Sequence, residues 1–131
     1  MIAVGGEHVT AMPDFCLATS KADFVVMGEG EEIIIDLPDF IDETRPLAQV
    51  AGIAFREGGS VIVNSRRDRQ ADVDAIPRPA WQHFDLQTYA DHHYIGGIDI
   101  SGLSVPLLAT RGCPYQCTYC SAPNMWTPRW I

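Results

Sequence analysis

Long apolar runs and positively charged residues are both scarce in this sequence. No stretch of the 131 residues approaches the roughly 20 consecutive apolar residues of a membrane-spanning helix, so we expect no membrane span. Lys and Arg number 9 against 17 Asp and Glu, which gives a net charge of −8. Because affinity for nucleic acid depends largely on Lys and Arg, this balance argues against a nucleic-acid partner.

The N-terminus lacks the basic start, apolar middle and small-residue cleavage site of a secretory signal. We therefore expect a cytoplasmic protein, in which disulfides are rare. Internal repeats and low-complexity segments are also absent. With 47% hydrophobic and 20% charged residues, the composition is globular and requires no more than one core.

Basic residues cluster at one place, where Arg66, Arg67 and Arg69 are interleaved with Asp68 and Asp72. Charge runs of mixed sign usually face solvent. We therefore predict a solvated loop here rather than a phosphate site.

The segment ADFVVMGEGEEIIIDL has the pattern of a strand, a glycine turn and a helix. Residues 23–27 predict a short apolar strand, residues 28–31 predict a turn, and the helix that follows is expected to place three apolar residues on one face: Ile33, Ile34 and Leu37. Units of this kind belong to parallel sheets covered by helices, which predicts an α/β fold. Pro38 is expected to kink or stop the helix, with the acids near it facing water: Asp36, Asp39, Asp42 and Glu43.

Three further segments have strand patterns. The opening MIAVGGEHVT begins as an apolar strand and runs directly into Gly5 and Gly6. GIAFREGGSVIVN predicts a β-hairpin, with strands at 53–56 and 60–64 and a turn that needs positive φ at its glycines. Residues 105–109 predict a short strand that leads into the cysteines.

From about residue 65 the sequence becomes rich in proline and aromatic residues, and we assign residues 67–104 to a linker. We expect it to pack without a core of its own, through four side chains: Trp81, Phe84, Leu86 and Tyr89. Its histidines are expected to be surface or packing residues: His83, His92 and His93.

Three of the four cysteines, Cys113, Cys117 and Cys120, lie within eight residues. Their spacing on a loop lets three thiolates converge on one metal centre. A structural zinc site usually has four ligands, and the chain has no second C-x-x-C pair. Cys16 lies far upstream, where a small buried hydrophobic residue is expected. The alternative is a set of reactive or zinc-binding cysteines.

Three thiolates on a four-iron cluster leave one iron open to an outside ligand. At this point the motif C-x-x-x-C-x-aromatic-C, with Tyr119 as the aromatic residue, resembles the radical S-adenosylmethionine (SAM) enzymes. The resemblance implies a 4Fe-4S cluster on Cys113, Cys117 and Cys120, with SAM chelating the open iron. It further implies that Tyr119 lies near the adenine, and that SAM is cleaved to a 5'-deoxyadenosyl radical. The electron would come from an external donor such as flavodoxin or ferredoxin.

Upstream, a G-G-x-H-x-T pattern precedes a G-x-G-E pattern and the proline-aromatic linker. This order is similar to that of the Rossmann-like (flavodoxin-like) cobalamin-binding domain in one branch of the radical SAM family. The resemblance assigns eight residues to cobalamin: Gly5, Gly6, His8, Thr10, Gly28, Glu29, Gly30 and Glu31. Taken alone, glycine pairs at strand ends are most often tight turns, and His8 is more often a hydrogen-bonding loop residue than an axial cobalt ligand. The D-x-H-x-x-G motif of ligand histidines is absent.

The resemblance implies three regions. Residues 1–66 would be the C-terminal part of the cobalamin-binding domain, 67–104 the linker, and 105–131 the first strand and cluster loop of a radical SAM α/β barrel. We therefore expect a fragment of a larger protein, inactive alone, lacking the downstream G-G-E contacts to SAM. Strands without neighbours would make the isolated chain poorly stable.

The function implied is that of a cobalamin-dependent radical SAM enzyme acting on a small-molecule substrate. It would be a methyltransferase for an unactivated carbon or phosphorus, with methylcobalamin as donor, or an oxidative cyclase of the tetrapyrrole type. One alternative is a methylthiotransferase, although these carry additional cluster cysteines in the first domain. The other is a non-catalytic iron-sulfur or cobalamin-binding module.

Overall fold

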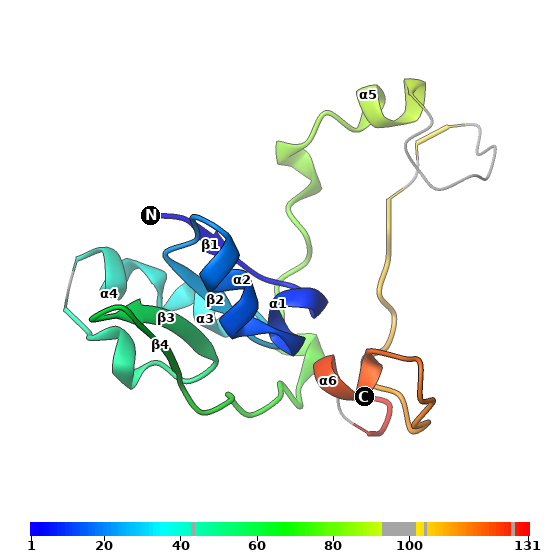
Figure 1. Ribbon diagram of the computed structural model, residues 1–131. Helices are drawn as coiled ribbons and strands as arrows, with labels where there is room; N and C mark the ends of the chain where they lie inside the picture. Colours follow the sequence, from blue (N-terminus) through cyan, green and yellow to red (C-terminus); the bar gives the residue numbers. More distant parts are fainter. Residues whose placement is uncertain (43, 93–101, 104, 127) are drawn as a thin grey trace.

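The computed structural model describes residues 1–42, 44–92, 102–103, 105–126 and 128–131. Glu43 and His93, both expected to face solvent or to pack at the surface, lie outside the described residues, as does the side chain of Leu37. The segment up to β4 forms an α/β body, and the rest of the described chain extends from it (Figure 1).

A four-stranded mixed sheet is the centre of this body. Its strands lie in chain order: β1 (Ala3–Val4), β2 (Phe24–Val26), β3 (Ile53–Glu57) and β4 (Ser60–Val63). β1 pairs with β2 in parallel, whereas the β2–β3 and β3–β4 pairs are antiparallel. The predicted strand at 23–27 and the hairpin at 53–64 are confirmed, and Gly58 and Gly59 adopt the positive φ that the hairpin turn requires.

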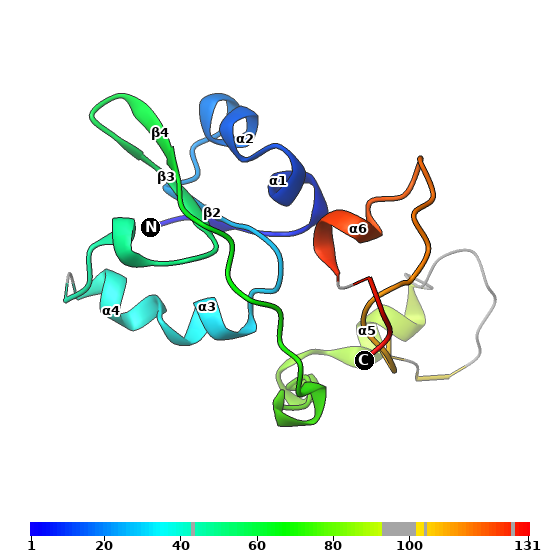
Figure 2. The same ribbon diagram turned by 90° about the horizontal axis from the view of Figure 1, so that it is seen from below.

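Helices cover both faces of the sheet. Seen from below (Figure 2), α1 (Glu7–Ala11) and α2 (Pro13–Thr19) lie on one face, and α3 (Glu31–Ile35) and α4 (Leu37–Ile41) lie on the other. Alternation along β2 supplies both layers, because Val25 packs with the α1–α2 side and Phe24 with the α3–α4 side. Burying each such side chain contributes roughly 1.5–3 kcal/mol. The predicted α/β architecture is therefore confirmed.

The helical segment after β2 differs from the expected pattern. α3 buries Ile33 at 1% exposure but leaves Ile34 68% exposed, so the prediction that both share a buried face is wrong. Consecutive helix positions point about 100° apart, and a five-residue helix has room for only one of them against the sheet. Pro38 lies in the first turn of α4, so the predicted interruption before it is confirmed.

The acids of this segment also divide. Asp39 and Asp42 are exposed as predicted. Asp36 is not, because its side chain is 20% exposed and forms ion pairs with Arg45 at 3.4 Å and Arg67 at 3.0 Å. No local pattern indicated these partners, which lie in later segments of the chain.

β3 and β4 are tied to the helices by side chains that bind backbone carbonyls. Arg56 of β3 donates to the carbonyls of Ala22 and Ser20, both at 2.7 Å, and to that of Leu17 in α2. A guanidinium at this position satisfies carbonyls that a helix end leaves free. The side-chain amide of Asn64 donates to the carbonyls of Leu47 and Val50, both at 2.7 Å, which holds η1 (Leu47–Gln49) beside β4.

Beyond β4 the described chain has only short helices: η2 (Val73–Ala75), η3 (Trp81–His83), α5 (Leu86–Asp91) and α6 (Ala122–Met125). The expected linker has no buried hydrophobic residue among those described, which agrees with a segment that lacks its own core. Trp81 and Phe84 contact each other with ring centroids 6.0 Å apart, as the predicted packing of the linker requires, while Phe84 and Tyr89 remain about half exposed. His83 and His92 are exposed, as expected.

The strand predicted at 105–109 is also wrong. In the described part of the chain this segment is irregular, pairs with no strand, and leaves Leu107 87% exposed. A strand needs a neighbour to satisfy its backbone groups, and an apolar sequence alone does not provide one. None of the described helices is both long and apolar enough to cross a membrane.

α3 offers a matched test of the core. Ile33→Ala should lower the free energy of unfolding by about 2–5 kcal/mol, because it leaves a cavity beside the sheet. Ile35→Ala on the same helix, at a side chain 73% exposed, should change it by less than about 0.5 kcal/mol. Urea unfolding followed by circular dichroism measures both; equal losses would contradict the observed burial.

Candidate functional site

Two glycine turns meet at one edge of the sheet. Gly5 and Gly6 follow β1, and Gly28 to Gly30 follow β2. Because β1 and β2 are parallel neighbours, both turns lie at the carboxyl ends of the strands, where open α/β sheets bind ligands. The structure thus brings together the two glycine motifs that the sequence assigned to one cofactor.

Thr10 joins the two turns. Its hydroxyl donates to the Gly6 carbonyl at 2.8 Å and accepts from the Gly28 amide at 2.9 Å. Thr10 is 2% exposed and lies in α1, a helix that sequence reasoning missed. Its role is therefore to hold the turns together, and its hydroxyl already has two partners within the chain.

The glycines themselves leave room for a ligand. Gly6 and Gly28 have φ of 110° and 81°, and a Cβ added at either would meet nothing within 4 Å. A Cβ added at Gly5 or at Gly30 would lie 3.7 Å from the Val26 side chain, an ordinary packing distance. The open space at the two turns fits a cofactor that approaches the backbone closely.

His8 lies on α1 beside these turns and is exposed. Its ring meets that of Phe15 edge-on, with centroids 6.3 Å apart. An exposed ring at this position leaves open both roles considered from the sequence, loop hydrogen bonding and ligation.

Glu29 and Glu31 point toward Arg111. Arg111 Nη1 donates to Glu29 Oε1 at 3.2 Å, and Nη2 donates to Glu31 Oε1. Partial burial is the largest single influence on Glu31 and opposes its ionisation, but the hydrogen bond and charge of Arg111, together with backbone hydrogen bonds, outweigh it and lower the pKa of Glu31. The hydrogen bond to Glu31 likewise raises the pKa of Arg111. Both groups are therefore charged at neutral pH.

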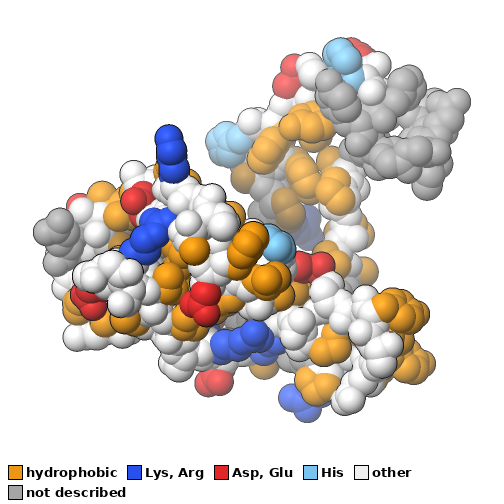
Figure 3. Space-filling model, viewed as in Figure 1, with side chains coloured by type: hydrophobic (Ala, Val, Ile, Leu, Met, Phe, Trp, Pro, Cys, Tyr) orange, Lys and Arg blue, Asp and Glu red, His pale blue; other side chains and the backbone are white. Residues whose placement is uncertain are grey.

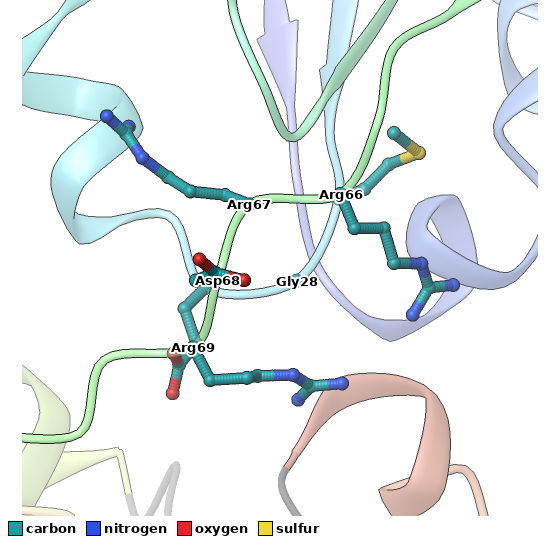
Figure 4. Close-up of a pocket in the computed structure, with 7 residues that line it drawn as sticks. Gly28, Arg66, Arg67, Asp68 and Arg69 are labelled. Carbon is teal, nitrogen blue, oxygen red and sulfur yellow. The ribbon is translucent and has the colours of Figure 1, made fainter.

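The basic cluster lies on a loop with Arg66 and Asp68 exposed, as predicted, but its arginines also bind other segments of the chain. Arg67 pairs with Glu32 at 3.1 Å and with Asp36, whereas Arg66 and Arg69 donate to the Asn124 carbonyl at 2.9 and 3.3 Å. Figure 4 shows Arg67 directed away from the side chains of Arg66 and Arg69. Partial burial lowers the pKa of Arg69, with Arg66 adding to the shift and Glu29 opposing it.

The space enclosed by Gly28 and these arginines is small, at about 20 Å³. That volume holds about one water molecule. The cluster therefore acts as an attachment for α6 rather than as a pocket. Figure 3 shows Lys or Arg side chains at this junction between the α/β body and the C-terminal segment.

The cysteine loop lies next to this junction. Cys113 is half-buried and Cys117 and Cys120 are exposed, and all three thiols are free. The Cys120 amide donates to the Cys117 carbonyl at 3.1 Å, which closes a turn between these two thiols. Within the described ranges no group of three His, Cys, Asp or Glu side chains is arranged to hold a metal ion.

The donor set of this loop nevertheless fits an iron-sulfur cluster. Three free thiols on a short accessible loop are the ligands that such a cluster takes. Tyr119, between the second and third cysteines, is 90% exposed. Its location near the adenine of SAM stays a prediction.

α6 fastens the far end of the loop to the body. It lies against α1 and buries Met125 at 6% exposure. The Ser121 hydroxyl donates to Glu7 of α1 at 2.7 Å. The cysteine loop therefore sits between two attachments to the same edge of the sheet.

Comparison with known proteins shows which proteins this chain resembles. No protein-family model matches the chain. It is 29% identical over 130 residues to an uncharacterized methyltransferase of Pyrococcus horikoshii, covering 98% of the chain and 27% of that protein. It is 32% identical over 131 residues to the anaerobic magnesium-protoporphyrin IX monomethyl ester cyclase of Synechocystis sp., covering 99% and 24%.

Two further matches agree with these. The cytidylyl-2-hydroxyethylphosphonate methyltransferase of Streptomyces wedmorensis is 27% identical over 146 residues, covering 95% of this chain and 27% of that protein. Among solved structures, the radical SAM methyltransferase TsrM of Kitasatospora setae, with cobalamin and a 4Fe-4S cluster bound, matches with a TM-score of 0.65 and 18% identity. This match covers 98% of the chain and 25% of TsrM, and it shows a shared fold.

The fold and site define a Rossmann-like α/β unit followed by a three-cysteine loop. The recognition made from the sequence is confirmed: the chain is homologous to a segment of the cobalamin-binding radical SAM methyltransferases and cyclases. It spans about a quarter of the length of the curated relatives it matches.

The Thr10 bridge can be tested against a second threonine. Thr10→Val should cost about 1–3 kcal/mol in unfolding free energy, because the Gly28 amide loses its acceptor. Thr19, whose exposed hydroxyl donates to the Phe15 carbonyl at 2.8 Å, is the control, and Thr19→Val should cost less than about 0.5 kcal/mol. Thr10→Ser should recover most of the loss. Equal effects of the two valine variants in urea unfolding would contradict the bridge.

Proposed function

We propose that this chain supplies the cobalamin-facing edge and the cluster-binding loop of a radical SAM enzyme that transfers a methyl group or closes a ring. The observation that supports it most strongly is the position of the three-thiol loop, held beside two glycine turns at the carboxyl ends of parallel strands. The named activities of the relatives, methyl transfer and cyclisation, support the same two outcomes.

Cys113, Cys117 and Cys120 would hold a 4Fe-4S cluster, and Tyr119 would lie beside the adenine of SAM. When bound, the cluster supplies the electron that cleaves SAM, and cobalamin carries the methyl group in the methyltransferase version. Because the chain would bind the four-iron cluster through three thiols, one iron would stay open to an outside ligand. Supplying three ligands is therefore what this chain would contribute to the cluster. The exposure of Cys117 and Cys120 leaves that side of the loop accessible.

Gly6 and Gly28 would face cobalamin, since their α-carbons are open to a close approach. Gly5, Gly30 and the exposed His8 would form the margin of the same site. Thr10 would act behind the glycines by fixing both turns. Glu29 and Glu31 would contribute less directly than the sequence suggested, because Arg111 engages both carboxylates.

The remaining parts of the proposal follow from this chemistry. The substrate would be a small molecule, and the electron would come from a flavodoxin or ferredoxin in the cytoplasm. The methylthiotransferase alternative expects further cluster cysteines in the first domain, and Cys16 is 8% exposed within α2. A buried thiol on the helix layer supports the first proposal over that alternative.

The cluster assignment is tested by anaerobic reconstitution of the purified protein with ferrous salt and sulfide. The wild type should develop charge-transfer absorbance, and Cys113→Ala, Cys117→Ala or Cys120→Ala should each lose most of it. Cys16→Ala removes the fourth thiol from its buried place and should keep the absorbance. The proposal fails if the wild type gains no absorbance or if the triple alanine variant retains it.

Cobalamin binding is tested by two glycines with the same backbone conformation. Gly28 has φ of 81° and Gly59, in the hairpin turn, has φ of 84°, and neither has an atom within 4 Å of an added Cβ. Gly28→Ala and Gly59→Ala should therefore impose similar strain, about 1 kcal/mol. Only Gly28→Ala should weaken hydroxocobalamin binding, on the order of tenfold, equivalent to about 1.4 kcal/mol. Spectral titration measures this, and equal affinities would count against the assignment.

A further inference from the structure

Arg111 connects the glycine turn after β2 to the cysteine loop. It stands two residues before Cys113, and its side chain is 14% exposed. Its ion-pair partner Glu29 is 10% exposed, and Glu31, in the first turn of α3, is 37% exposed. Because Arg111 and Glu29 are largely removed from water, their pairing is screened less than a surface salt bridge, whereas the pairing with the more exposed Glu31 is screened more.

The guanidinium group is fixed by more than charge. Its two terminal nitrogens serve different carboxylates, Nη1 that of Glu29 and Nη2 that of Glu31. The guanidinium carbon also lies 5.5 Å from the ring centroid of Trp126, which follows α6. Glu29 accepts a second hydrogen bond, from the backbone N–H of Gln70 at 2.8 Å. A planar fork can satisfy both acids at once, which a lysine ammonium on a flexible stem does less well.

The backbone of Arg111 is held as well. Its amide donates to the Ile131 carbonyl at 3.0 Å, and the Ile131 amide donates back to the Arg111 carbonyl at 2.8 Å. Gly112, with φ of 93°, then turns the chain toward Cys113. The start of the cysteine loop is thus fixed in direction as well as in place.

We propose that Arg111 is a positioning residue that fixes the cysteine loop to the Gly28–Glu31 turn through Glu29 and Glu31. This proposal rests on the proposed function, which identifies the two cofactors as cobalamin and the 4Fe-4S cluster. It adds that the ion pairs of Arg111 with Glu29 and Glu31 set the distance between these two cofactors. The acids of the G-x-G-E motif then act on the loop that holds the cluster rather than on cobalamin.

The apo protein provides a test that needs neither cofactor. Arg111→Gln should raise the alkylation rate of the half-buried Cys113 thiol on the order of tenfold. Without the ion pairs, local opening of the loop costs less free energy, so the thiol is exposed more often. Hydrogen exchange at the amides of Arg111 and Ile131 should accelerate to a similar extent. Arg111→Lys should give an intermediate rate, since it keeps the charge and loses the fork.

Arg45→Gln is the matched control. It removes an ion pair to Asp36 at 3.4 Å in another part of the body and should leave Cys113 alkylation unchanged. Unfolding midpoints of all variants establish that the body stays folded. If Arg111→Gln itself does not fold, Arg111→Lys provides the same comparison.

A double-mutant cycle tests whether the acids act through Arg111. The Glu29→Gln/Glu31→Gln pair should accelerate alkylation by itself, and adding Arg111→Gln should cause no further increase. Additive effects, an unchanged rate in Arg111→Gln, or an equal rise in Arg45→Gln would each overturn the proposal.

The two proposals fail in different ways. If wild-type protein takes up no cluster while Arg111→Gln still loosens the loop, the positioning role stands and the proposed function falls. If the cluster forms and no variant changes the Cys113 rate, the positioning role falls alone. In the reconstituted protein with cob(II)alamin bound, the magnetic coupling between the paramagnetic cobalt and the reduced cluster should weaken in Arg111→Lys, a change that loss of stability alone would not produce.

Discussion

The parallel pairing of β1 with β2 is the constraint on which the site depends. Two residues of β1 suffice to bring the turn after Val4 beside the turn after Val26, and the Thr10 hydroxyl then joins them. Had β1 paired antiparallel, its glycines would lie at the opposite edge of the sheet. The α1 and α3 layers start from these same turns, so the helices and the open glycine edge follow from one strand pairing.

Ion pairs and hydrogen bonds of arginines hold the cysteine loop and α6 beside the glycine turns. The chain has an excess of acids, yet five of its arginines join distant segments: Arg56, Arg66, Arg67, Arg69 and Arg111. Each guanidinium presents several donors in one plane, so one side chain can bridge acids and carbonyls from separate elements. Scarce positive charge is thus concentrated at the contacts between layers and between the body and the cysteine loop.

Local patterns in the sequence predicted local structure well. The hairpin at 53–64 and the strand at 23–27 depend on alternation and turn glycines, which neighbouring residues encode. The partners of Arg66 and Arg111 lie 58 and 80 residues away along the chain, so no local pattern could identify them. The strand predicted at 105–109 fails for a related reason, because strand formation depends on a partner. The two glycine motifs lie together in space, as expected. No sequence pattern around Glu29 and Glu31 indicated their ion pairs with Arg111.

α6 gives the cysteine loop a chemical vulnerability apart from its thiols. Met125 is the buried residue of this short helix, at 6% exposure. Conversion to the sulfoxide would place a polar group at this buried position and release the helix from α1. Peroxide would then loosen the loop through its anchoring residue as well as through its sulfur ligands, and reduction of the sulfoxide would restore the attachment.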